Sequence, residues 1–140
     1  MGYCTQADIV GRYSDDDIVE LADHDRDGTV DAAVVTRAIN DASGQIDSYL
    51  QKKFVVPIPA PVPAVLCARC VDIAVYRLQL WRRSVTEDIK KAYDDAIQWL
   101  KDIVAGKVDI GLTPKPAEAA GAPNVLHDGQ PRLFGRDKPL

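Results

Sequence analysis

The distribution of proline constrains the fold of this 140-residue chain more than any other feature. All nine prolines lie in two blocks, the first at positions 57–63 and the second at positions 114–139. Proline removes a backbone donor and interrupts helices, so long helices can run only outside these blocks. The sequence therefore predicts helices before the first block, helices between the two blocks, and a C-terminal segment of different character.

Two short helices are predicted near the N-terminus. The first runs from Thr5 to about Arg12, with Asp8 placed as the capping-box-like partner of Thr5. The second begins at Ser14, whose side chain can cap the amides that follow. Acidic residues at 15–17 then occupy the positive end of the helix dipole, which favours a helix there.

A long third helix is predicted from its N-cap, Asp31, to about Lys53. Gly44 lies inside this helix at a cost of about 1 kcal/mol relative to alanine, and it indicates either a bend or a close contact with another helix. Apolar residues recur at intervals of three and four, namely Val35, Ala38, Ile39, Ala42, Ile46, Tyr49 and Leu50.

Two further helices are predicted between the proline blocks. Pro63 suits the first turn of the fourth helix, Thr86 caps the fifth, and Gly106 ends it. One face of the fourth helix contains Leu66, Cys70, Ile73, Ala74, Arg77, Leu78 and Trp81. The apolar stripe of the fifth contains Ile89, Tyr93, Ala96, Ile97, Leu100, Ile103 and Val104. Exposed pairs four residues apart are Glu87 with Lys91 and Lys90 with Asp94.

These elements predict an all-α fold: a small helical bundle of about three main helices with short N-terminal helices, over residues 1–112. Residues 113–140 hold five prolines and three glycines without an apolar period, which predicts an extended C-terminal arm. Near its end Leu133 and Phe134 lie between Arg132 and Arg136. Such an arm either becomes ordered on a partner or stays a disordered tail, and the sequence leaves both open.

Composition narrows the classes of partner. The net charge of -4 disfavours a nucleic-acid-binding surface over much of the domain, because phosphate binding requires clustered Lys and Arg. No apolar run approaches the ~18 residues of a membrane span, so no membrane partner is expected. The N-terminus, MGYCTQADIV, lacks the pattern of a secretory signal, and we expect a cytoplasmic setting.

The stretch DHDRDGTVD at positions 23–31 follows the spacing of an EF-hand calcium loop. Gly28 occupies the sixth position, where the loop needs glycine, but the twelfth position is Val34, which offers no oxygen. Without the closing glutamate, calcium would bind no more tightly than about 10⁻⁴ to 10⁻³ M. The candidate ligands are Asp23, Asp25, Asp27, the Thr29 carbonyl and Asp31.

The same residues also suit an acidic turn between two helices. Asp side chains bond to nearby backbone amides in turns, and Asp31 can cap the third helix. Four carboxylates within nine residues nevertheless repel one another and favour a cation or a basic partner. Apart from this weak calcium site, no cofactor is expected. A small calcium-binding helical interaction module is therefore one hypothesis for the function.

The charge pattern offers a different partner for the acidic stretch. Positions 15–31 hold eight acidic residues and one basic residue, a local charge of -7. In and just after the fourth helix, basic residues outnumber acidic ones, with Arg77, Arg82 and Arg83 as the candidate interaction residues. Identical subunits in a ring could pair two such patches between neighbours.

Other chemistry finds little support in the sequence. Cys67 and Cys70 form a CARC motif with redox or zinc spacing, but zinc needs two further ligands, and His24 and His127 are far away in sequence. Three apart on a helix, the two thiols fit a packed core better. No nucleophile motif, phosphate-binding glycine loop or distinct carboxylate pair is present, so no enzymatic activity is expected.

The order and spacing of several segments carry a family resemblance. These segments are YCTQADIVGRY, DHDRDGTVDAAV, AINDASGQIDSYLQKKF, the proline-rich link, LCARCVDIAVYRLQLW, AYDDAIQWLKDIVAGKVDIGL and the terminal PRLFGRD. Together, over essentially the full chain, they resemble the head-to-tail connector proteins of Mu-like phages and prophages. No single segment is decisive.

The resemblance implies a structural protein of the virion neck, assembled in the cytoplasm of a host bacterium. Copies would form a homo-oligomeric ring, commonly a dodecamer in related connectors, beneath the portal protein. The ring would present a surface to a tail-side neck or tail terminator protein. DNA would pass through the lumen only as cargo, and an acidic lumen would repel its phosphates.

In such rings terminal arms often insert into the portal or a neighbour. This would give a binding role to Arg132, Leu133, Phe134 and Arg136.

Overall fold

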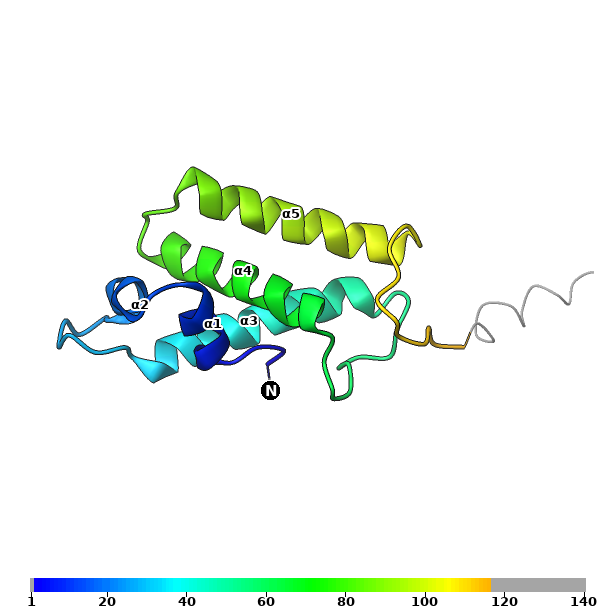
Figure 1. The fold of residues 1–140 in the computed structure, drawn as a ribbon, viewed down its shortest axis with the longest axis horizontal. Helices are drawn as coiled ribbons and strands as arrows, with labels where there is room; N and C mark the ends of the chain where they lie inside the picture. Colours follow the sequence, from blue (N-terminus) through cyan, green and yellow to red (C-terminus); the bar gives the residue numbers. More distant parts are fainter. Residues whose placement is uncertain (1, 117–140) are drawn as a thin grey trace, which may run out of the picture.

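The computed structural model describes residues 2–116, and within them the secondary structure is entirely helical (Figure 1). This confirms the predicted all-α class. None of the helices in this part of the chain combines enough length and apolar character to cross a bilayer. The five helices are α1 (Gln6–Arg12), α2 (Asp15–Ala22), α3 (Ala32–Leu50), α4 (Ala64–Trp81) and α5 (Glu87–Val104).

The predicted caps explain where the helices begin. Thr5 and Asp8 form a full capping box before α1, with the Asp8 carboxylate accepting from the Thr5 amide at 2.8 Å. Ser14, Asp31 and Thr86 each accept a hydrogen bond from an amide in the first turn of α2, α3 and α5.

The end of α3 differs from the prediction, because regular helix stops at Leu50 rather than near Lys53. The amides of Lys52 and Lys53 bond to carbonyls three residues back, at 3.4 and 2.9 Å. This tighter pattern closes the helix with a final narrow turn.

The three long helices lie side by side and form the body of the molecule, with α4 between α3 and α5 (Figure 1). The short helices α1 and α2 contact α4 as well, so that α4 is covered on more than one side. Consequently Val71, Asp72 and Val75 are buried in addition to the predicted face. The sequence therefore predicted too few buried residues on α4, because it indicated a single buried face.

Gly44 lies in an unbroken stretch of α3. A Cβ atom placed on it would meet nothing within 4 Å. The prediction of a close helix contact at this glycine is therefore wrong, because no neighbouring helix approaches it.

The molecule has two opposite ends (Figure 1). The charged end consists of α2, the loop at 23–31 and the α4–α5 turn at 82–86. The proline end consists of residues 51–63 and 105–116, where the Lys115 amide donates to the Lys53 carbonyl at 2.9 Å. The chain therefore stays attached to the bundle a few residues past 112, the predicted end of the helical domain.

Candidate functional surface and acidic loop

The acidic loop brings three of its predicted ligands together. Carboxylate oxygens of Asp23, Asp25 and Asp27 lie within 4.8 Å of one another. Asp23 accepts from the Gly28 amide at 2.8 Å, and Asp27 accepts from the Thr29 amide at 2.8 Å. Gly28 has a φ of 86°, which the tight turn requires.

These hydrogen bonds shift the pKa values of the three carboxylates in different directions. The Thr29 side chain and amide lower the pKa of Asp27. At Asp23, desolvation opposes ionisation, but the Gly28 and Asp27 amides outweigh it and lower the pKa. A hydrogen bond with Asp23 raises the pKa of Asp25. Asp25 is therefore the carboxylate of this cluster that takes up a proton first as the pH falls.

The other predicted ligands have structural contacts. Asp31 caps α3 by accepting from the Ala33 amide at 3.1 Å. At Thr29 the hydroxyl, rather than the carbonyl that was the predicted ligand, donates to Asp27 at 2.6 Å. Val34, in the position where a calcium loop has its closing glutamate, is buried in the hydrophobic core. The loop thus presents three clustered carboxylates, those of Asp23, Asp25 and Asp27, which already accept bonds from the loop itself.

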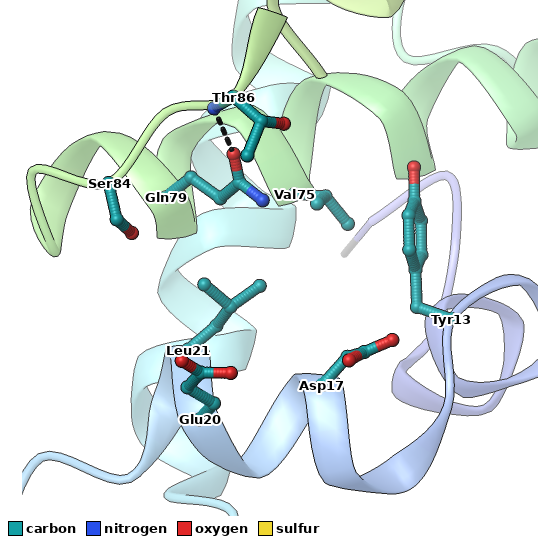
Figure 2. Close-up of a pocket in the computed structure, with 8 residues that line it drawn as sticks. All are labelled: Tyr13, Asp17, Glu20, Leu21, Val75, Gln79, Ser84 and Thr86. Carbon is teal, nitrogen blue, oxygen red and sulfur yellow. Dashed lines mark hydrogen bonds between the residues drawn. The ribbon is translucent and has the colours of Figure 1, made fainter. Parts of the chain in front are cut away.

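A pocket of about 390 Å³ lies between α2 and the C-terminal half of α4 (Figure 2). Asp17 and Glu20 reach it from α2, while Leu21 and Val75 form its apolar part. The Gln79 side chain accepts from the Thr86 amide at 3.0 Å and thereby fixes the α4–α5 turn beside it. The complete lining is Tyr13, Asp17, Glu20, Leu21, Val75, Gln79, Ser84 and Thr86.

Arg82 and Arg83 follow α4 directly and are exposed. They precede Ser84, which lines the same pocket as Asp17 and Glu20. The structure therefore places Arg82 and Arg83 of the predicted basic patch at the same end of the bundle as Asp17 and Glu20 of the acidic patch. Among residues 2–116, no ion pair involves Arg82 or Arg83.

Arg77, the third predicted interaction residue, contacts the interior of the bundle. Its guanidinium donates to the Gln45 side chain at 2.8 Å, and Gln45 donates to the Tyr93 hydroxyl at 2.8 Å. Tyr93 stacks on Tyr76 with ring centroids 4.0 Å apart. This chain of contacts connects α3, α4 and α5, so Arg77 is placed apart from the exposed Arg82 and Arg83.

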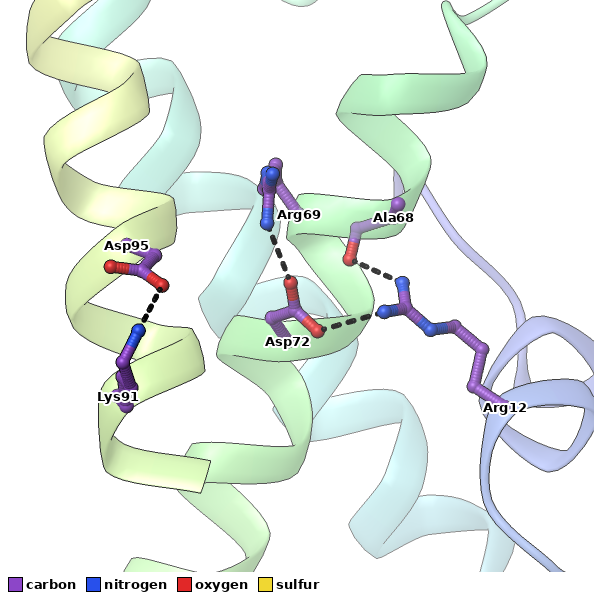
Figure 3. A network of polar contacts seen from close by, with 6 residues as sticks. All are labelled: Arg12, Ala68, Arg69, Asp72, Lys91 and Asp95. Atoms are coloured by element: carbon purple, nitrogen blue, oxygen red, sulfur yellow. Dashed lines mark hydrogen bonds and ion pairs between the residues drawn. The ribbon is translucent and has the colours of Figure 1, made fainter. Parts of the chain in front are cut away.

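Asp72 is the centre of a buried polar network that was not predicted from the sequence (Figure 3). Its carboxylate is 3% exposed and lies 3.5 Å from Arg12 of α1 and 3.2 Å from Arg69 of α4. Arg12 also donates to the Ala68 carbonyl at 3.3 Å. Burial raises the pKa of Asp72, although both arginines act to lower it. The sequence does contain a signal for this network, because Asp72 is an acidic residue between Val71 and Ile73, inside an apolar run.

Lys91 pairs with Asp95 at 3.4 Å, instead of the predicted Glu87 (Figure 3). The predicted pair of Lys90 with Asp94 is present at 2.9 Å. Both pairs lie on exposed parts of α5.

Cys70 is buried in the core as expected, and Cys67 is partly buried. The sulfur of Cys70 lies 3.1 Å from that of Cys4, a contact between residues far apart in the sequence. The predicted interaction residues Arg132, Leu133, Phe134 and Arg136 lie outside the described residues.

The family model described as "Bacteriophage Mu, Gp36" matches residues 3–126 of the chain. The chain belongs to the bacteriophage Mu Gp36 family. A member of similar length, "Gene product J" of Escherichia phage Mu, is 32% identical over 138 residues, covering 97% of this chain and 96% of that protein.

A second relative of the Gp36 family is the "Mu-like prophage FluMu protein gp36" of Haemophilus influenzae. It is 28% identical over 135 residues, covering 96% of this chain and 94% of that protein. The matches thus extend over the described helical bundle and into the segment that follows it.

Proposed function

We propose that the chain is a structural protein of a tailed-phage virion, a head-to-tail connector. Copies form a homo-oligomeric ring, with twelve subunits expected, between the portal protein and a tail-side neck or tail terminator protein. The observation that carries this proposal is membership of the Gp36 family, with similarity to a phage relative over nearly the whole of both chains.

The shape of the subunit supports the proposal. An adaptor must contact more than one partner, and the bundle has two ends (Figure 1) whose residues differ in type, charged at one end and rich in proline at the other. The charged end carries Arg82 and Arg83 beside the acidic residues of α2. At the proline end the described part of the chain ends at Pro116, and we assign the contact with a partner or a neighbouring copy to residues 117–140.

The charged end is the surface through which neighbouring copies in the proposed ring contact one another. Arg82 and Arg83 have no acidic partner in the described part of the subunit, so their charges are available to another molecule. Exposed ion pairs are individually weak, but several arranged around a ring select partner and orientation. DNA would pass through the lumen as cargo without a binding site of its own.

Mixing the purified chain with portal complexes tests the proposal. Native mass spectrometry and negative-stain microscopy are expected to show a ring of the chain added to the portal. The double variant Arg82→Glu/Arg83→Glu should lose this ring, because it reverses both charges. The matched variant Arg82→Lys/Arg83→Lys keeps the charges and should retain it.

A wild-type chain that adds to no portal complex would contradict the connector function. A ring that forms equally well with the Arg82→Glu/Arg83→Glu variant would retain the function but remove the charged end as its contact surface.

Calcium binding is a second candidate function, favoured by the three carboxylates within 4.8 Å. A calcium titration followed by circular dichroism should then give a saturable change near 10⁻⁴ to 10⁻³ M, lost in Asp25→Asn. No change up to about 10⁻² M calcium, well above that range, would remove this candidate.

A further inference from the structure

The sulfur atoms of Cys4 and Cys70 lie 3.1 Å apart in the interior of the protein. Cys4 belongs to the short segment before α1, whereas Cys70 lies in the middle of α4. Both are free thiols, with exposed fractions of 5% and 0%. A disulfide bond is about 2.05 Å long, so the two sulfurs need to approach by only about 1 Å.

Neighbouring contacts hold the N-terminal segment in this position. The Tyr3 amide donates to the Ser43 hydroxyl at 2.9 Å, and the Tyr3 hydroxyl donates to Asp47 of the same helix. Ser43 in turn lies 3.6 Å from the Cys70 sulfur. The residue before Cys4 is therefore anchored on α3, which keeps the Cys4 sulfur against α4.

We propose that Cys4 and Cys70 form an intramolecular disulfide site, with low-molecular-weight disulfides such as oxidised glutathione as the oxidant. The bond would tie the N-terminal segment covalently to the central helix of the bundle. It would close a loop that contains α1, α2 and α3.

The two thiols have different roles in the exchange. The hydrogen bond from Cys4 lowers the pKa of Cys70, and the same bond raises the pKa of Cys4. Cys70 is therefore the first nucleophile, because the thiolate is the reactive form and the contact with Ser43 on α3, which also lowers the pKa of Cys70, remains when residues 2–4 separate from α4. The third thiol, Cys67, lies one turn earlier on α4, and burial raises its pKa to about 11, which disfavours its attack at neutral pH.

The reaction consists of two thiol–disulfide exchanges. The Cys70 thiolate attacks one sulfur of oxidised glutathione, which forms a mixed disulfide and releases one glutathione thiolate. Cys4 then gives up its proton, attacks the Cys70 sulfur and displaces the second glutathione thiolate. Two electrons pass from the protein to glutathione, and the two protons end on the two glutathione thiols.

Access to Cys70 requires a local opening, because the side chain is fully buried. Separation of residues 2–4 from α4 exposes it without unfolding the bundle, and such openings cost less than global unfolding. Oxidation should therefore be slower than that of an exposed thiol.

The biological setting, but not the chemistry of the site, rests on the proposed function. A neck subunit assembles in a reducing cytoplasm and then leaves the cell with the particle, where disulfides persist. The Cys4–Cys70 bond would form after assembly and fix the subunit in its final shape.

The test equilibrates the full chain in glutathione buffers of graded reduction potential, then denatures it and labels free thiols with a maleimide. The three cysteines should all be labelled in the reduced chain, and only Cys67 in the oxidised chain. Peptide mapping should join the Cys4 and Cys70 peptides. The oxidised chain should melt about 5 °C or more higher, because the bond restricts the unfolded state.

Three variants separate this site from its alternatives. Cys67→Ser should form the same bond with the same shift in melting temperature. Cys4→Ser and Cys4→Ala should keep the helical spectrum but form no intramolecular bond. Three labelled thiols in oxidising buffer, or a wild-type bond between Cys67 and Cys70, would overturn the proposal. Failure of the chain to join portal complexes would leave these results unchanged, so the two proposals fail separately.

Discussion

At the scale of single residues, Asp72 shows how a charge is kept inside this bundle. Its carboxylate is almost fully buried, and two arginines from different helices approach it. Desolvation nevertheless dominates and raises its pKa. Buried pairs of this kind add little net stability, but removing one partner leaves a charge that nothing compensates.

Asp72 yields a prediction about the pH dependence of stability. Because its pKa is raised on folding, the folded protein holds this proton at a higher pH than the unfolded chain. Stability contributed by the protonated form is therefore lost as the pH rises from about 3.9, the ordinary carboxyl value, through the raised pKa. The wild-type protein should lose stability relative to Asp72→Asn across that window, as measured by urea unfolding at several pH values.

Arg69→Met is the companion variant, because it keeps an apolar side chain near Trp99 while removing one charge partner. At neutral pH it should lower the free energy of unfolding by about 1–2 kcal/mol, since Arg69 is partly exposed. In the Asp72→Asn background the loss should shrink. Equal losses in both backgrounds would show that the Arg69–Asp72 pair does not matter for stability.

At the scale of helices, Gly44 offers a direct test of the packing around α3. Since a Cβ atom there would meet nothing within 4 Å, Gly44→Ala should stabilise the protein by up to about 1 kcal/mol in urea unfolding. Gly106→Ala is the matched control. Its φ of 86° should make the same change destabilising by about 1 kcal/mol or more. A destabilising Gly44→Ala would indicate a close contact that the structure does not contain.

Asp31 distinguishes the capping role of the loop from a ligand role. Asp31→Ala should lower the free energy of unfolding by about 1 kcal/mol, because it removes the side-chain acceptor at the start of α3. Asp31→Asn should retain most of the stability, because an amide oxygen can still cap the helix. If Asp31→Ala is as stable as wild type in calcium-free buffer, the cap does not contribute.

The sequence predicted the helices well because their starts depend on local chemistry. Thr5, Ser14, Asp31 and Thr86 all cap helices at the expected positions. The features that were predicted less accurately depend on tertiary packing. Residues 51–53 close α3 with a tight turn that periodicity does not reveal. The burial of α4 on several sides follows from the placement of α1 and α2, which no local pattern encodes.

At the scale of the whole molecule, candidate sites arise where distant segments meet. The pocket of Figure 2 combines α2 with the turn after α4, and the Cys4–Cys70 pair combines positions 66 residues apart. Spacing alone could indicate the acidic loop, because its residues are contiguous. It could not indicate contacts that depend on how the helices pack.

The two ends of the bundle suit a subunit that joins one structure to another. The charged end offers two arginines that form no ion pair within residues 2–116, whereas at the proline end Lys115 is bonded to the backbone of Gln51 and Lys53, just after α3. In the proposed ring the charged end would contact neighbouring copies. Membership of the bacteriophage Mu Gp36 family is consistent with a structural protein of a phage.

Electron cryomicroscopy of assembled particles tests the connector role most directly. We expect a ring of density between portal and tail into which copies of the α3–α4–α5 bundle fit. A neck in which no density accommodates this bundle, in particles that join head to tail normally, would contradict it.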